Sequence, residues 1–210
     1  MFKKFIIKKE LILERRNNTS LFLITPTMIV LITVFPILIE NRFKVHNDLF
    51  TVVELMYLII FSTLFSIRNP LDETILQREL NFASIKVRDY FFNKTLSELI
   101  IFLPQLLLMT FLFKILTNTS LTPNILYFLA TLLFFSLNSI MINLFFQFFT
   151  AFNSRFVQFT LITPIYIGLT ILIAPIWLGV NLEVSNIYLI MYIGITLITY
   201  SFTNFYLREV

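Results

Sequence analysis

Six long apolar stretches alternate with short polar connections along the chain. The stretches lie at 21–39, 49–67, 95–116, 125–149, 156–180 and 187–207. Each is close to the roughly 20 residues that an α-helix needs to cross the hydrocarbon core of a bilayer. Backbone polar groups that face lipid must be satisfied within their own segment, so each stretch is predicted to be a transmembrane helix. The pattern therefore predicts an all-α membrane protein with six spans.

The longest polar interruption is the loop 68–94, in which charges of both signs alternate. Its apolar residues recur at helical spacing, and Pro70 suits the first turn of a helix. We predict a short amphipathic helix with apolar Leu71, Ile75, Leu76 and Leu80 and polar Asp72, Glu73, Gln77, Arg78 and Glu79. Mixed charge favours a protein partner over an anionic lipid surface, and the alternative is a solvated connector.

A second amphipathic pattern precedes the first apolar stretch. Residues 2–16 place apolar side chains on one helical face and six Lys and Arg side chains on the remainder. This arrangement is typical of an interfacial helix that lies on an anionic leaflet. The alternative interpretation is a positively charged tail that only sets the topology of the chain.

The composition agrees with a membrane protein. The chain of 210 residues is 58% hydrophobic and 13% charged, whereas soluble domains carry about 25% charged residues. No polar stretch is long enough to form a soluble domain, so residues 1–210 are interpreted as one six-span domain. The chain has no cysteine, which excludes disulfides, thiolate metal sites and covalent haem attachment through cysteine.

Lys and Arg residues are distributed unevenly between the predicted connections. Thirteen of the 16 fall on the side that holds the N-terminal tail, the 68–94 loop and the C-terminus. The positive-inside rule therefore predicts that both termini and the 68–94 loop face the cytoplasm, or the matrix in a mitochondrion. The net charge of +4 is explained by this topology, and we expect no nucleic-acid partner.

Few ionisable side chains lie inside the predicted spans. Glu54, near the outer end of the second span, is predicted either to make a buried polar contact or to remain hydrated. Glu98 and Lys114, near opposite ends of the third span, are expected to extend towards the interface. Trp177 is expected to anchor the fifth span at the headgroups.

Residues for catalysis or cofactor binding are scarce. His46 is the single histidine, and it is either a haem ligand or, in the more ordinary case, a solvated loop residue. The chain contains no phosphate-binding GxxxxGK[ST] motif and no recognisable nucleophile elbow or metal-ligand cluster. We therefore predict that it is not an enzyme, has no catalytic residue and binds no cofactor directly.

Three segments carry a family resemblance. Residues 61–96, FSTLFSIRNPLDETILQRELNFASIKVRDYFFNKTL, combine a Ser- and Leu-rich span end, a charged helix around Leu76–Leu80 and a following lysine, Lys94. Glu14, Arg15 and the run 19–22 form a charged segment before the first span, and 161–175, LITPIYIGLTILIAP, is a proline-containing fifth span. In these features the chain resembles the haem exporter protein B (CcmB) family.

The resemblance implies a membrane subunit of an ABC-type complex in cytochrome c maturation. Such a subunit forms a homodimer and works with a separate CcmA-like ATPase and with CcmC-like and CcmE-like haem-handling proteins. It would couple ATP hydrolysis to release of the haem chaperone or to haem transport, in a bacterial cytoplasmic membrane or a mitochondrial inner membrane. The alternatives are a permease of another ABC-type exporter, for a drug or polysaccharide, and a membrane assembly factor without transport activity.

Overall fold

The computed structural model describes residue 12 and residues 25–42, 47–67, 86–117, 125–149, 155–178 and 182–209. Within these ranges lie six long helices: α2 (Thr25–Arg42), α3 (Asn47–Ile67), α5 (Val87–Thr117), α6 (Ile125–Phe149), α7 (Arg155–Trp177) and α8 (Leu182–Glu209). Each corresponds to one of the apolar stretches of the sequence. The described part of the chain is all-helical, as predicted.

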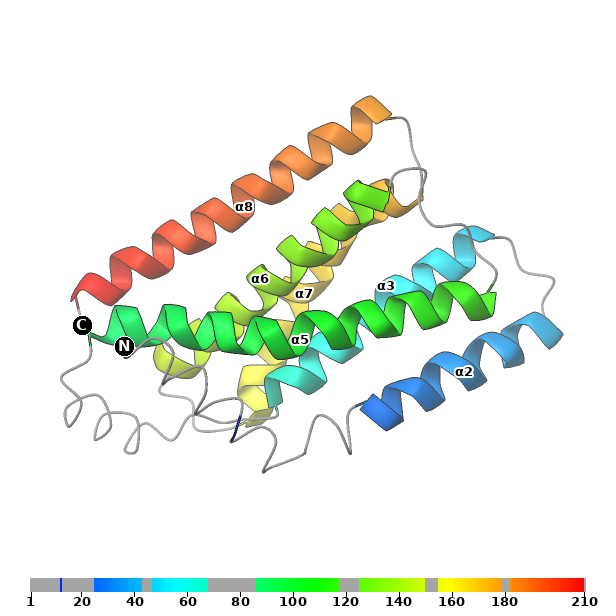
Figure 1. Ribbon diagram of the computed structural model, residues 1–210, viewed down its shortest axis with the longest axis horizontal. Helices are drawn as coiled ribbons and strands as arrows, with labels where there is room; N and C mark the ends of the chain where they lie inside the picture. The colour runs from blue at the N-terminus through cyan, green and yellow to red at the C-terminus, as the bar shows by residue number, and fades with distance from the viewer. Residues whose placement is uncertain are drawn as a thin grey trace.

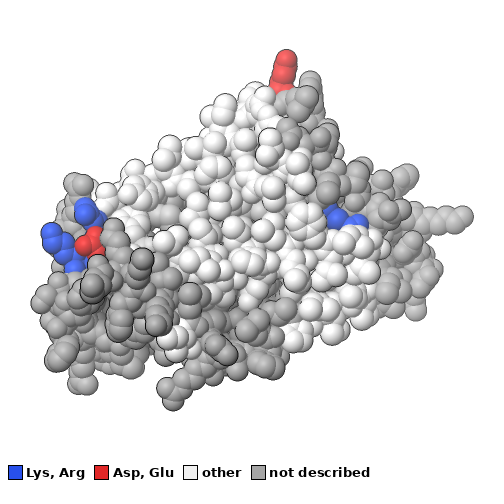
Figure 2. Space-filling model, in the orientation of Figure 1, with Lys and Arg blue, Asp and Glu red and all other residues white. Residues whose placement is uncertain are grey.

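Four of these helices, α5 to α8, contain segments that are long and apolar enough to cross a membrane. In α3 the apolar stretch Phe50–Phe65 is shorter. The fold is therefore that of a helical protein with four helices that could span a membrane, and the six-span topology stays a prediction. On the face shown in Figure 2, the charged atoms of the described residues lie towards the ends of the molecule, and the surface between them is uncharged.

Consecutive helices run in opposite directions, so that α2, α5 and α7 begin at the end of the bundle where α3, α6 and α8 finish (Figure 1). Helix α6 is central and packs on α5, α7 and α8, while α3 packs mainly on α7. Helices α2 and α8 lie at opposite edges of the bundle (Figure 1). Below, the Lys94 end is the end where α5 begins, and the Lys114 end is the end where α5 finishes.

The loop predicted at 68–94 ends earlier than expected, because helix α5 already begins at Val87. Residues 87–94 are therefore helical and belong to the 31 residues of α5. At 31 residues α5 is longer than the roughly 20 residues that cross a hydrocarbon core, which leaves room for polar residues at its start. Asp89 in the first turn interacts favourably with the helix dipole. The N-terminal segment 2–16 apart from residue 12, His46 and the predicted coupling residues Asp72, Glu73, Leu76, Gln77, Arg78, Glu79 and Leu80 lie outside the described residues.

The bundle is packed with aromatic side chains. Phe102 on α5 lies 4.6 Å from Phe65 and 5.1 Å from Phe61 of α3, measured between ring centroids. A Cβ atom added at Gly168 or Gly194 would meet nothing within 4 Å, so neither glycine marks a close helix crossing. Packed aromatic rings therefore contribute to the contact between α3 and α5.

Candidate functional site

Two charged side chains from different helices meet inside the bundle at the Lys114 end. Glu54 lies two turns into α3, and Lys114 lies in the last turn of the antiparallel α5. Lys114 Nζ is 3.0 Å from Glu54 Oε2, and the two side chains are only 5% and 2% exposed. The second carboxylate oxygen, Oε1, has no hydrogen-bond partner among the described residues. A buried ion pair therefore joins α3 to α5.

Aromatic rings complete the surroundings of the lysine. The Lys114 ammonium lies 5.4 Å from the ring centroid of Phe128 and 5.6 Å from that of Trp177. The two rings are 5.1 Å apart, and Trp177 Nε1 donates a hydrogen bond of 3.0 Å to Thr131 Oγ1. A cation over two ring faces is stabilised most where it is desolvated. We call Glu54, Lys114, Phe128, Thr131 and Trp177 the Glu54 cluster, which links α3, α5, α6 and α7.

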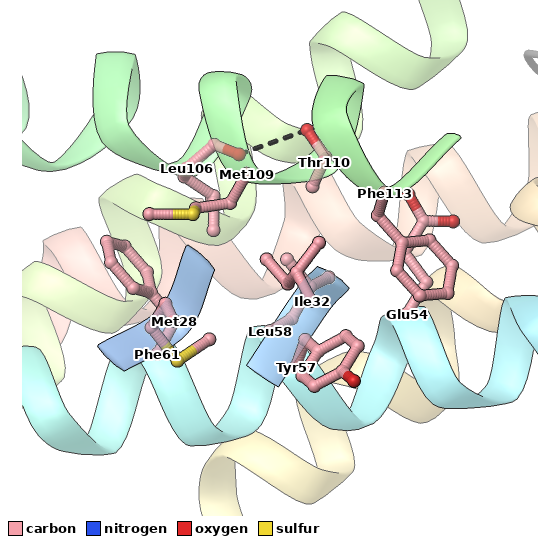
Figure 3. Close-up of a pocket in the computed structure, with 10 residues that line it drawn as sticks. All are labelled: Met28, Ile32, Glu54, Tyr57, Leu58, Phe61, Leu106, Met109, Thr110 and Phe113. Carbon is pink, nitrogen blue, oxygen red and sulfur yellow. Dashed lines mark hydrogen bonds between the residues drawn. The ribbon is translucent and has the colours of Figure 1, made fainter. Parts of the chain in front are cut away.

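A small cavity adjoins Glu54 between α2, α3 and α5 (Figure 3). Its volume of about 10 Å³ is close to the space of a single water molecule. Thr110 Oγ1 lines it and donates to the Leu106 carbonyl at 3.0 Å (Figure 3). Nearby, the Tyr57 hydroxyl donates to the Leu31 carbonyl at 2.9 Å and so links α3 to α2. This cavity has no room for a substrate, and the Glu54 cluster is suited to fixing helices in place.

A second buried ion pair lies at the Lys94 end. Lys94 Nζ is 3.8 Å from Glu98 Oε1 one turn along α5, and the two side chains are 6% and 5% exposed. Beside them, buried Asn93 donates through Nδ2 to the Asp89 carbonyl at 2.5 Å. Helix α5 therefore carries a buried lysine near each of its ends, and each lysine is paired with a glutamate.

Polar side chains also connect α6, α7 and α8 in the middle of the bundle. Asn138 Nδ2 donates to Thr196 Oγ1 at 2.8 Å, and the Tyr166 hydroxyl donates to the Ser139 carbonyl at 3.1 Å. The buried hydroxyl of Tyr192 has no hydrogen-bond partner among the described residues. Interhelical hydrogen bonds of this kind hold membrane helices together.

Three sequence-based expectations are corrected. Lys114 and Glu98 were expected to extend to the interface, but the residues are 5% and 4% exposed and each has a charged partner in the bundle. Trp177 was expected to anchor at the headgroups, but it is 4% exposed and packs on Phe128. The reason is pairing: an opposite charge or a hydrogen-bond acceptor on a neighbouring group makes the buried position favourable.

Of the predicted site residues, the structure places Glu54 in a buried polar contact. The partner could have been found from the sequence, because Glu54 and Lys114 carry opposite charges at the same predicted depth of two neighbouring spans. Nothing in the sequence indicated that Phe128 would contact Lys114 or that Thr131 would bond to Trp177. Among the described residues, no group of three or more His, Cys, Asp or Glu side chains could hold a metal ion.

The two ion pairs and the polar contacts of α6 to α8 are electrostatic interactions that fix the helices relative to one another. Comparison of the chain with protein-family models, with curated proteins and with solved structures finds no match.

Proposed function

We propose that the chain is the membrane subunit of an ABC-type complex that handles haem during cytochrome c maturation. It couples ATP hydrolysis by a separate CcmA-like subunit to release of the haem chaperone or to haem transport. The proposal takes its reaction and partners from the resemblance to the CcmB family in residues 61–96 and 161–175. Its partners include CcmC-like and CcmE-like proteins and a second copy of the chain, in an inner or bacterial cytoplasmic membrane.

The observation that supports a coupling role is the continuity of α5. The predicted coupling segment 71–80 precedes α5, which then runs unbroken from Val87 to Thr117 and contacts α2, α3, α6 and α8. An α-helix of 31 residues is about 46 Å long. A movement at the start of α5 can therefore be passed to the Glu54 cluster at its other end through one continuous helix.

The predicted topology places the site of ATP use at the Lys94 end. The distribution of Lys and Arg puts the 68–94 segment and both termini on the cytoplasmic or matrix side, where ATP is present. Helix α3 finishes and α5 begins at this same end (Figure 1). An ATPase bound there would act on the segment between these two helices.

The experiment is affinity purification of the tagged protein, with cytochrome c maturation as the functional readout. We expect an ATPase subunit to co-purify, and we expect Glu79→Lys or Arg78→Glu to stop cytochrome c maturation while the level of the protein is unchanged. Glu183→Lys is the matched control, because Glu183 is exposed at the start of α8, at the opposite end of the bundle. Normal cytochrome c in the Glu79 and Arg78 variants would refute the coupling role.

A complementation experiment separates haem handling from the alternative transport functions. The gene is expressed in a strain that lacks its CcmB subunit, and holocytochrome c is measured. Restored holocytochrome c is the expected result. Failure to restore it, with co-purification of an ATPase, would instead favour a permease for a drug or polysaccharide.

A further inference from the structure

A polar cavity of about 240 Å³ lies at the Lys94 end, between the first turns of α5 and the last turns of α8. Its lining comes from two helices that are more than a hundred residues apart in sequence: Arg88, Asp89, Phe92, Asn93, Tyr200 and Asn204. It is much larger than the cavity beside Glu54 and has room for a small polar group. Among the described residues, the members of the Glu54 cluster do not contribute to it.

The cavity presents a cation and an anion side by side. Arg88 Nε lies 4.0 Å from Asp89 Oδ1, and the two side chains are 42% and 49% exposed. A pair this long and this exposed contributes little to stability, so both charges can interact with a ligand at small cost. The Phe92 and Tyr200 rings, 5.1 Å apart, form an aromatic wall beside them. The lining therefore suits a small zwitterion that has a phosphate for the guanidinium and an ammonium for the carboxylate.

The position of the cavity along α5 matches the headgroup layer of a bilayer. From Lys94 to Lys114 an α-helix rises about 30 Å, which is the thickness of the hydrocarbon core. The two buried ion pairs are therefore about one core thickness apart along α5. By the same rise Asp89 lies about 7 Å beyond Lys94, and the headgroup layer on each side is roughly 5–7 Å thick.

Exposed apolar side chains continue from the cavity towards the middle of the bundle. On α5, Leu96 and Ile100 follow Phe92 at intervals of one turn, and each is 47% exposed. On α8, Leu197 precedes Tyr200 by one turn and is 60% exposed. Helices α5 and α8 are close at this end and separate towards the other (Figure 1). Acyl chains attached to a headgroup in the cavity would contact these apolar side chains.

We propose that this cavity binds the headgroup of an aminophospholipid such as phosphatidylethanolamine. Arg88 binds the phosphate, Asp89 binds the ammonium group, and the acyl chains lie on the apolar residues of α5 and α8. Soluble phosphoethanolamine offers the same two charges but lacks the acyl chains. Its binding would leave Leu96, Ile100 and Leu197 without a role.

The test is native mass spectrometry of the purified full-length protein, delipidated in detergent and titrated with phosphatidylethanolamine, phosphatidylglycerol or soluble phosphoethanolamine. We expect phosphatidylethanolamine to bind most tightly and phosphoethanolamine to bind at least tenfold more weakly. Arg88→Gln is expected to weaken phosphatidylethanolamine binding by about tenfold or more, because a charge-assisted hydrogen bond is lost. Asp89→Asn is expected to remove the preference over phosphatidylglycerol, which has no ammonium.

Lys86→Gln is the matched control, because it removes the same charge at the same end of α5 from an exposed side chain that does not line the cavity. It should leave binding unchanged, and all three variants should melt within about 4 °C of the wild type, because the Asp89 charge in the first turn contributes at most about 1 kcal/mol. Equal loss of binding in the Lys86 and Arg88 variants would overturn the proposal, because it would show a diffuse charge effect. Equal affinity for phosphoethanolamine and the lipid, or for the two lipids, would also overturn it.

Discussion

The sharpest prediction concerns the Glu54–Lys114 ion pair and its effect on the free energy of unfolding. Glu54→Gln and Lys114→Met each remove one charge with little change in side-chain length, and the double variant removes both. Either single variant leaves the remaining charge buried without its partner at 3.0 Å, in a bundle where both side chains are at most 5% exposed. We expect each single variant to be strongly destabilised and the double variant to recover most of the loss.

The magnitude follows from the geometry. At 3.0 Å the attraction of two unit charges is about 5–6 kcal/mol at an effective dielectric constant of 20. Desolvation costs several kcal/mol per ion and offsets most of this attraction, so the net contribution of the intact pair is small. Removal of one partner costs roughly 3–5 kcal/mol, because the desolvation of the other is then uncompensated.

The two single variants should not be equal. Lys114 has a long flexible stem, so in the Glu54→Gln variant its ammonium can move towards the nearby interface and recover hydration. The Glu54 carboxylate has a shorter side chain and cannot do so in the Lys114→Met variant. That variant also loses the attraction of the Phe128 and Trp177 rings, worth about 2 kcal/mol for a desolvated cation. Lys114→Met is therefore expected to be the less stable of the two.

The assay is thermal unfolding of the purified protein in detergent, followed by the loss of the monodisperse species in size-exclusion chromatography. At about 2–4 °C per kcal/mol for a chain of this size, a single variant should lose roughly 6 °C or more. Ile115→Ala is the matched control, since the neighbouring side chain is 74% exposed and should change the melting temperature little. If the loss in the double variant equalled the sum of the two single losses, the charges would not be coupled, and the reasoning would be refuted.

Other predictions use the same unfolding assay. Trp177→Phe keeps a ring but removes the hydrogen bond to Thr131, and it should cost about 0.5–1.5 kcal/mol; an unchanged melting temperature would contradict that bond. Tyr166→Phe removes the bond to the Ser139 carbonyl and should cost about 1 kcal/mol. Tyr192→Phe removes a buried hydroxyl without a partner among the described residues, so it should leave stability equal or higher. A loss in Tyr192→Phe as large as in Tyr166→Phe would show that this hydroxyl is bonded in the folded protein.

The helices of this fold were predictable where apolar runs are uninterrupted. The run 125–149 coincides with α6, because lipid-facing backbone has to form its hydrogen bonds within the segment. The start of α5 was missed because Val87–Lys94 contains polar residues that resemble a loop in sequence. A helix can continue past the hydrocarbon core at no penalty for charge, so hydropathy marks the edge of the core rather than the end of the helix.

The site was only half predictable. Glu54 was recognisable because a carboxylate at membrane depth is costly without a partner. Lys114 and Glu98 were assigned to the interface because the sequence does not show which helix faces they occupy, and that depends on the packing of α5 against its neighbours. The pairing of Trp177 with Thr131 depends on the contact between α6 and α7, which no local pattern reveals.

The two buried lysines also restrict how α5 can move if it couples an ATPase to the opposite face. A shift of α5 along its axis by one turn, about 5.4 Å, would carry Lys94 and Glu98 into the hydrocarbon or take Lys114 away from Glu54 and the two rings. Both movements separate or bury charges at a cost of several kcal/mol. A change in tilt or bend leaves both pairs near their present depth, so it is the movement that this helix permits.

The residue that allows such a bend is Pro104, midway between the two lysines. Proline has no N–H, so the Ile100 carbonyl lacks its usual partner in the helix and the helix bends there more easily. Pro104 is exposed, so Pro104→Ala should fit without repacking and should raise or maintain the melting temperature. In the proposed complex we expect this variant to retain its ATPase partner but to lower holocytochrome c. Full activity in a Pro104→Ala variant of higher stability would show that α5 transmits movement as a straight helix.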